Sequence, residues 1–97
     1  MKTYVILRRN GWRGGPELEA AAARSTAVGD EEMPADIRWI RSYVLDEGDG
    51  ALGTVCVYQA SSEQAIRNHA AKAGLPVDEI ISVADTVIVR EDPVAAA

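Results

Sequence analysis

Six segments with strand or helix character alternate along the 97 residues, and few folds accept their order. Four runs are rich in β-branched and aromatic residues, and two contain strong helix formers. In chain order we predict a strand at 3–7, a helix at 17–28, strands at 37–45 and 54–60, a second helix, and a last strand at 80–89. The second helix begins after Ser61 or Ser62 as its cap and ends at Gly74, with Pro76 just beyond.

The order strand, helix, strand, strand, helix, strand is that of the split βαβ arrangement, the ferredoxin-like fold. The sequence therefore predicts an α+β protein in which two helices cover one face of a four-stranded antiparallel sheet. Gly29 is expected to end the first helix, and the glycine-rich run 46–53 is expected to join two strands as a hairpin. The length fits a single domain at 1–93, followed by a flexible tail at 94–97.

The strand at 37–45 is apolar on both of its faces. Strict alternation gives one set of Ile37, Trp39, Arg41, Tyr43 and Leu45, and a second set of Arg38, Ile40, Ser42 and Val44. Neither set is plainly polar, whereas two helices can cover only one face of the sheet. We therefore expect the second face to meet another subunit, a ligand, or both, and we predict a homodimer through that face.

Charge and composition exclude several classes of protein. Fifteen acidic residues against ten Lys and Arg give a net charge of -5, which disfavours binding to nucleic acid through a basic surface. A single cysteine cannot form an internal disulfide, and the apolar start at 1–7 is too short for a signal sequence or a membrane span. The sequence predicts a soluble, cytoplasmic protein with no membrane partner.

Four stretches, "IRWIRSYV", "VCVYQA", "AIRNHAAKAGLP" and "VREDP", resemble a family of small bacterial ferredoxin-like proteins of unknown function. The family takes its name from a nickel-binding actinobacterial member, and the resemblance covers roughly residues 4–93. The matching residues, in order, are Trp39, Ser42, Tyr43, Cys56, Tyr58, His69, Gly74 and Pro76. Gln59 and Ser61 depart from the pattern, which tends to have an acid and a proline there. The resemblance implies the ferredoxin-like fold, a dimer and nickel binding.

Cys56 and His69 are the only cysteine and the only histidine of the chain, and they are the candidate metal ligands. Thiolate, imidazole and carboxylate are the donors that nickel or another divalent transition metal requires. A dimer would double these donors, and Asp46, Glu47 or Asp49 could add oxygens. The alternative for Cys56 is a small buried hydrophobe, and for His69 a core histidine whose hydrogen bonds are satisfied.

Aromatic side chains on the two central strands suggest a second kind of site. Trp39, Tyr43 and Tyr58 could line a cleft on one sheet face with His69 at its edge, suited to a small organic ligand or to acid–base chemistry. Packing is the alternative reading of such strand aromatics. Three functions stay open: metal binding in storage, buffering or delivery; a small dimeric enzyme or ligand-binding protein; and an interaction module without chemistry.

Overall fold

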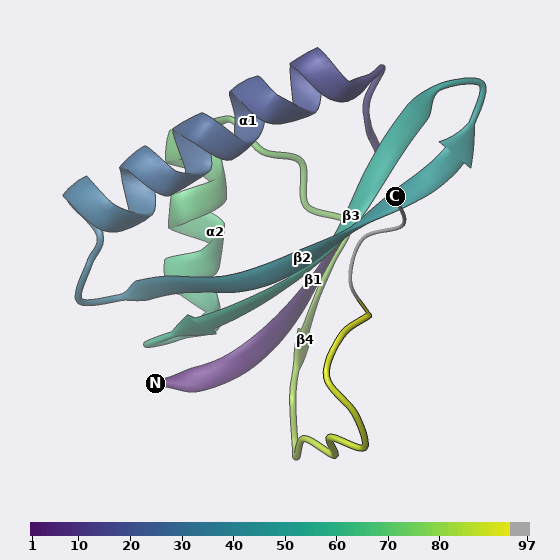
Figure 1. Ribbon diagram of the computed structural model, residues 1–97. Helices are drawn as coiled ribbons and strands as arrows, with labels where there is room; N and C mark the ends of the chain where they lie inside the picture. The colour runs from purple at the N-terminus through teal and green to yellow at the C-terminus, as the bar shows by residue number, and fades with distance from the viewer. Residues whose placement is uncertain (94–97) are drawn as a thin grey trace.

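A computed structural model describes residues 1–93 of the chain and shows the predicted order of elements. The strands are β1 (Lys2–Trp12), β2 (Ile37–Gly48), β3 (Ala51–Ala60) and β4 (Glu79–Ser82), and the helices are α1 (Gly15–Ala27), the π-helical turn η1 (Val28–Glu32) and α2 (Glu63–Ala73). The strands form one sheet in the order β2-β3-β1-β4, with every neighbouring pair antiparallel. Both helices lie on the same side of this sheet (Figure 1). The predicted ferredoxin-like α+β fold is confirmed.

The hydrophobic core lies between the helices and the sheet. Tyr4 and Ile6 of β1 alternate toward it, as do Tyr58 and Ala60 of β3, and Ile66 of α2 packs against them. Small residues on both helices, including Ala21 on α1 and Ala70 and Ala73 on α2, are buried as well. The predicted caps of α2 are confirmed: the Ser62 hydroxyl accepts a hydrogen bond from the Ala65 amide, and Gly74 takes the left-handed conformation with φ of 68°.

The first helix does not stop at Gly29 as predicted. Gly29 has no positive φ, so it does not form the left-handed cap that ends a helix at glycine. The chain instead continues through the π-helical turn η1, in which the Met33 amide donates to the Val28 carbonyl across 3.0 Å. The chain that follows the predicted end of this helix is therefore partly helical.

The last residues of β1 and β4 also differ from the prediction. β1 continues past Leu7 to Trp12, and its pairing with β3 is irregular between Arg8 and Trp12, where Asn10 has φ of 49°. β4 ends at Ser82 rather than at residue 89. It pairs with β1 in a register that joins Tyr4 to Ser82. Because β1 begins at Lys2, a strand that reached residue 89 would have no partner beyond residue 84.

A β-bulge in β2 overturns the strict alternation expected for residues 37–45. Trp39 lies opposite Tyr58, but the next pair is Arg41 with Val57, so Ile40 is an extra residue. The bulge leaves Trp39 on the helix side of the sheet, whereas Tyr43 lies on the opposite, open face.

The chain after β4 turns back along the open face of the sheet (Figure 1). Asp92 accepts hydrogen bonds there from Arg41, at 2.6 Å, and from the Tyr43 hydroxyl, at 2.8 Å. Apolar side chains nevertheless remain exposed on this side of the molecule: Ile40, Tyr43, Ile81, Val87, Ile88 and Val89. The tail predicted at 94–97 lies outside the described residues, and the homodimer stays a prediction.

Candidate functional site

A pocket of about 310 Å³ opens between α1 and the helix side of the sheet. One wall is the small-residue face of α1, where Ala21, Ala22 and Ser25 line it. The other walls come from the strands and include both tryptophans of the chain, Trp12 and Trp39. The alanines of α1 are too short to fill the space above these large rings, which explains why a pocket exists at this place.

Tyr58 links the pocket to both helices. Its hydroxyl lies 2.9 Å from the Ser25 hydroxyl of α1, and both residues line the pocket. Its ring stacks with that of Trp39, at a centroid distance of 6.1 Å, and meets His69 of α2 edge to face at 5.4 Å. Burial raises the pKa of the Tyr58 phenol, so this side chain is a neutral hydrogen-bonding group at neutral pH.

His69 is fully buried and its tautomer follows from its one hydrogen bond. Nε2 lies 3.0 Å from the Ser25 carbonyl oxygen, which can only accept, so Nε2 carries the proton. Nδ1 therefore has a free lone pair, and it has no partner within residues 1–93. Burial lowers the pKa of His69, and the nearby charge of Arg8 lowers it further, against the effect of the Ser25 hydrogen bond. The imidazole is neutral at neutral pH.

Arg8 is the residue of this site that the sequence reasoning missed. Only 1% of its surface is exposed, and it lines the pocket. Nη1 donates to the Pro76 carbonyl at 2.7 Å, whereas Nη2 has no partner within residues 1–93. The available signal was the alternation of β1, which puts Arg8 on the same face as Tyr4 and Ile6. The predicted strand at 3–7 stops one residue before this arginine.

The structure places the two candidate metal ligands differently. Cys56 is a free, buried thiol that lines the pocket, and its Sγ lies 3.3 Å from the Thr54 hydroxyl. His69 is not among the residues that line the pocket, and it lies behind the ring of Tyr58. Across the part of the chain that the structure describes, no hydrogen bond joins Cys56 to His69.

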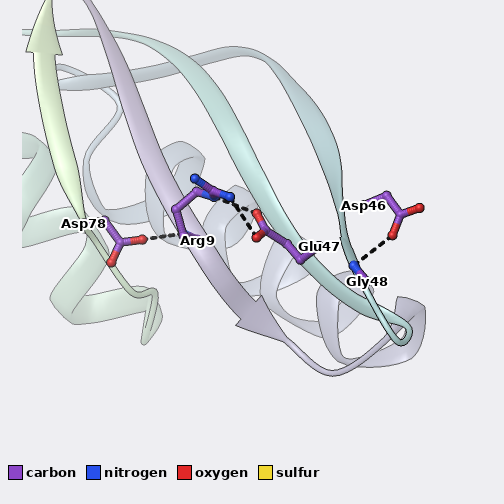
Figure 2. A network of polar contacts seen from close by, with 5 residues as sticks. All are labelled: Arg9, Asp46, Glu47, Gly48 and Asp78. Atoms are coloured by element: carbon purple, nitrogen blue, oxygen red, sulfur yellow. Dashed lines mark hydrogen bonds and ion pairs between the residues drawn. The ribbon is translucent and has the colours of Figure 1, made fainter.

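Two of the hairpin acids proposed as further oxygen donors, Glu47 and Asp46, make other contacts. Figure 2 shows Glu47 facing the guanidinium of Arg9, which it binds through both oxygens at 2.7 and 3.0 Å. The Asp78 carboxylate accepts from the backbone amide of Arg9, and Asp46 accepts from the Gly48 amide within the turn. The hydrogen bond from Arg9 lowers the pKa of the Glu47 carboxyl. These acids stabilise the far end of the hairpin.

The donors of a metal site are not gathered in one chain. Within residues 1–93, no three side chains of His, Cys, Asp or Glu lie close enough together to hold a metal ion. The buried positive charge of Arg8, which already lowers the pKa of His69, also opposes a cation there. A single chain, as far as its described residues reach, does not fit a nickel ion.

The predicted cleft of Trp39, Tyr43 and Tyr58 forms only in part. Trp39 and Tyr58 line the pocket under α1, whereas Tyr43 lines a hollow on the open face together with the segment that follows β4. The reason is the bulge at Ile40, which reverses the alternation between Trp39 and Tyr43. The prediction of one cleft shared by both tyrosines is wrong.

The fold and the pocket define a small ferredoxin-like protein. The chain belongs to the SCO4226-like family, described as nickel-responsive proteins, through a match over residues 4–83. The predicted family is thereby confirmed, and its description indicates a metal-related role. The crystal structure of SCO4226 from Streptomyces coelicolor A3(2) is similar, with a TM-score of 0.69 and 20% identity over 88% of this chain and 99% of that one. That likeness supports the shared fold.

No curated protein matches this sequence significantly. None of the helices in residues 1–93 is both long and apolar enough to cross a membrane.

Proposed function

We propose that this protein binds a small organic molecule in the pocket between α1 and the sheet. The observation that supports this function is the combination of an apolar wall with a few convergent polar groups. Leu18, Val44 and Trp12 provide apolar surface, whereas Ser25 and Tyr58 offer hydroxyl groups. Ligand sites are typically pockets of about 300–1,000 Å³ that are lined mainly by apolar side chains with a few polar groups.

The size of the pocket argues against a packing defect. Protein interiors are packed as densely as organic crystals, and voids larger than a water molecule are few. A space of about 310 Å³ is many times the roughly 30 Å³ that a water molecule occupies in the liquid. A molecule that binds the folded chain and not the unfolded one would stabilise the fold.

A neutral fluorescent probe tests whether the pocket binds ligands. N-phenyl-1-naphthylamine, whose emission rises in apolar surroundings, is titrated into the wild type, Ala22→Leu and Ala20→Leu. Ala22 lines the pocket, whereas Ala20 is an exposed residue of the same helix and serves as the matched control. We expect the emission to rise with the wild type and Ala20→Leu and to fall away with Ala22→Leu. Equal emission with all three proteins would refute the pocket as the site.

Metal binding is the second candidate function, in nickel storage, buffering or delivery. Two observations favour it: the family description, and the hydrogen bond from His69 Nε2 to a backbone carbonyl. Histidines that bind metals usually donate their other ring N–H in this way. His69 Nδ1 would be one ligand and the Cys56 thiolate a candidate for another. Because one chain gathers too few donors within residues 1–93, this function requires donors from a second copy.

Calorimetric titration with nickel, and separately with zinc, tests the metal candidate. Tag-free, chelator-treated wild type is compared with His69→Ala and Cys56→Ser, after circular dichroism has shown that each variant is folded. Heat of binding that is lost in His69→Ala supports the metal function. Binding that both variants retain would place the metal elsewhere, and absence of binding to the wild type would remove this candidate.

We also propose that the protein is a cytoplasmic homodimer that associates through the open face of the sheet. The exposed apolar residues of that face include Ile40, Tyr43 and Ile81. Large apolar side chains exposed on one face are typical of protein–protein interfaces.

A further inference from the structure

We propose that the ligand of this pocket is a monocarboxylate with an apolar body, and that Arg8 binds the carboxylate. The inference rests on the small-ligand function proposed above and specifies the chemical class of the ligand.

Arg8 is a buried charge without a counter-charge. With 1% of its surface exposed, it forms no ion pair within residues 1–93. Exposed arginines of the same chain, in contrast, find carboxylates: Arg9 pairs with Glu47 and Arg41 with Asp92. A buried ionised group is strongly unfavourable unless an opposite charge or hydrogen bonds compensate it. Within residues 1–93 the hydrogen-bond acceptor of the Arg8 side chain is the Pro76 carbonyl, and an anion in the pocket would supply the missing counter-charge.

The orientation of the guanidinium suits a carboxylate. Nη1 is fixed by the Pro76 carbonyl, and Nη2 has no partner within the described residues. The guanidinium carbon lies 6.0 Å from the centre of the Tyr58 ring, which further restricts the group. A planar fork of donors held in place in this manner binds carboxylates better than a flexible ammonium does.

The remaining lining selects for a single negative charge on an apolar body. Among the residues that the structure describes, no lysine and no second arginine lines the pocket beside Arg8, so a phosphate or a dicarboxylate would keep excess charge unpaired. The acidic residue found in this lining, Glu19, is exposed and repels further negative charge. Trp12, Leu18 and Val44 offer contact for hydrocarbon or an aromatic ring. Tyr58 does not compete for Arg8 as an anion, because burial raises the pKa of its phenol.

Paired ligands test the assignment. The probes are 3-phenylpropanoate, its neutral analogue 3-phenylpropanamide, and acetate, which has the carboxylate without the apolar body. Both tryptophans line the pocket, so quenching of tryptophan fluorescence reports occupancy directly, and calorimetry gives the affinity. Because a hydrogen bond to a charged group contributes more than a neutral one, we expect the wild type to bind the acid about 10- to 100-fold more tightly than the amide.

Two arginine variants complete the design. Arg8→Met should bind acid and amide about equally, whereas Arg24→Met should retain the preference of the wild type. Arg24 is the matched control because it also donates to a backbone carbonyl, that of Ala73 at 2.9 Å, yet it does not line the pocket. If Arg8→Met does not fold, the comparison of acid with amide on the wild type still tests whether the pocket prefers a carboxylate.

Each failure points to a different proposal. Equal binding of acid and amide by the wild type overturns the role of Arg8 and leaves the ligand-binding function standing. Acetate binding as tightly as 3-phenylpropanoate overturns the apolar body. Failure of both phenyl compounds, while N-phenyl-1-naphthylamine still binds in the pocket, overturns the carboxylate assignment. Failure of that neutral probe as well removes the proposed function itself.

Discussion

Replacing Tyr58 with phenylalanine removes one oxygen atom from the contact between α1 and β3. The Tyr58 hydroxyl and the Ser25 hydroxyl are 2.9 Å apart, and both side chains are buried. The ring of phenylalanine can keep its contacts with Trp39 and His69, so the loss is confined to the hydrogen bond. A net hydrogen bond contributes about 1 kcal/mol, and a buried partner left unsatisfied raises the loss to about 1–3 kcal/mol.

The assay is urea denaturation of the wild type, Tyr58→Phe, Ser25→Ala and the double variant. For a domain of this length, about 1 kcal/mol corresponds to a lowering of Tm by roughly 4–8 °C, which a thermal scan measures independently. Because each single variant breaks the same bond, we expect the double variant to be less destabilised than the sum of the two, by about 0.5–2 kcal/mol. Strictly additive losses would refute the reasoning, since they would mean that the two hydroxyls do not interact.

Three further perturbations have defined outcomes. Burial lowers the pKa of His69 in the folded protein, so on acidification the unfolded chain takes up a proton before the folded one does. The free energy of unfolding should therefore fall as the pH drops below about 6.5, by up to about 1.4 kcal/mol per pH unit. The variant His69→Gln removes the only histidine of the chain, and it should flatten this slope in urea titrations between about pH 5 and 7. Gly53→Ala should lower the free energy of unfolding by about 1–3 kcal/mol, because a Cβ there would lie 2.6 Å from Glu47 Oε1 and 2.7 Å from the Arg8 carbonyl oxygen. Gly15→Ala is the control: a Cβ at that position would meet no heavy atom within 4 Å, so the free energy of unfolding should change by less than about 0.5 kcal/mol. Sedimentation velocity should give the mass of two chains for the wild type and of one chain for Ile40→Asp, with Ala20→Asp on the outer side of α1 as the control; a wild type that sediments as one chain would contradict the proposed dimer.

The order of elements could be predicted because each segment carries its own local signal. α2 is the clearest case, with Ser62 as a cap, a periodic apolar stripe and Gly74 as its end. The ends of β4 and of α1 could not be predicted from such signals. The register of β4 with β1 leaves no partner beyond residue 84, and this limit is a property of the pairing and not of the run of valines and isoleucines. α1 continues into η1 because Gly29 does not adopt the left-handed conformation that its sequence position suggested.

The candidate site was predicted in part, and its errors share a cause. Trp39 and Tyr58 were predicted to share a cleft, and they do line one pocket. Their pairing also depends on the bulge, because the register of Arg41 with Val57, continued without it, would place Trp39 opposite Gln59. The place of Tyr43 depends on one extra residue in β2, and no local preference of Ile40 marks the bulge. Arg8 was overlooked because a charged residue is rarely buried without a partner. Arg8 is buried because the alternation of β1 places it on the core face, although its charge favours exposure. A residue that departs from such a local rule indicates a functional site.

The charge of Arg8 also relates the two candidate functions to each other. A positive charge that lowers the pKa of His69 disfavours a proton there, and it disfavours a divalent cation for the same electrostatic reason. A carboxylate bound to Arg8 would neutralise that charge and would therefore raise both the pKa of His69 and its affinity for a metal. By reciprocity, a metal bound at His69 would tighten the binding of the carboxylate. Nickel titrations in the presence and in the absence of 3-phenylpropanoate would reveal this coupling as a difference in nickel affinity. Equal affinities would mean that the two sites are independent of each other.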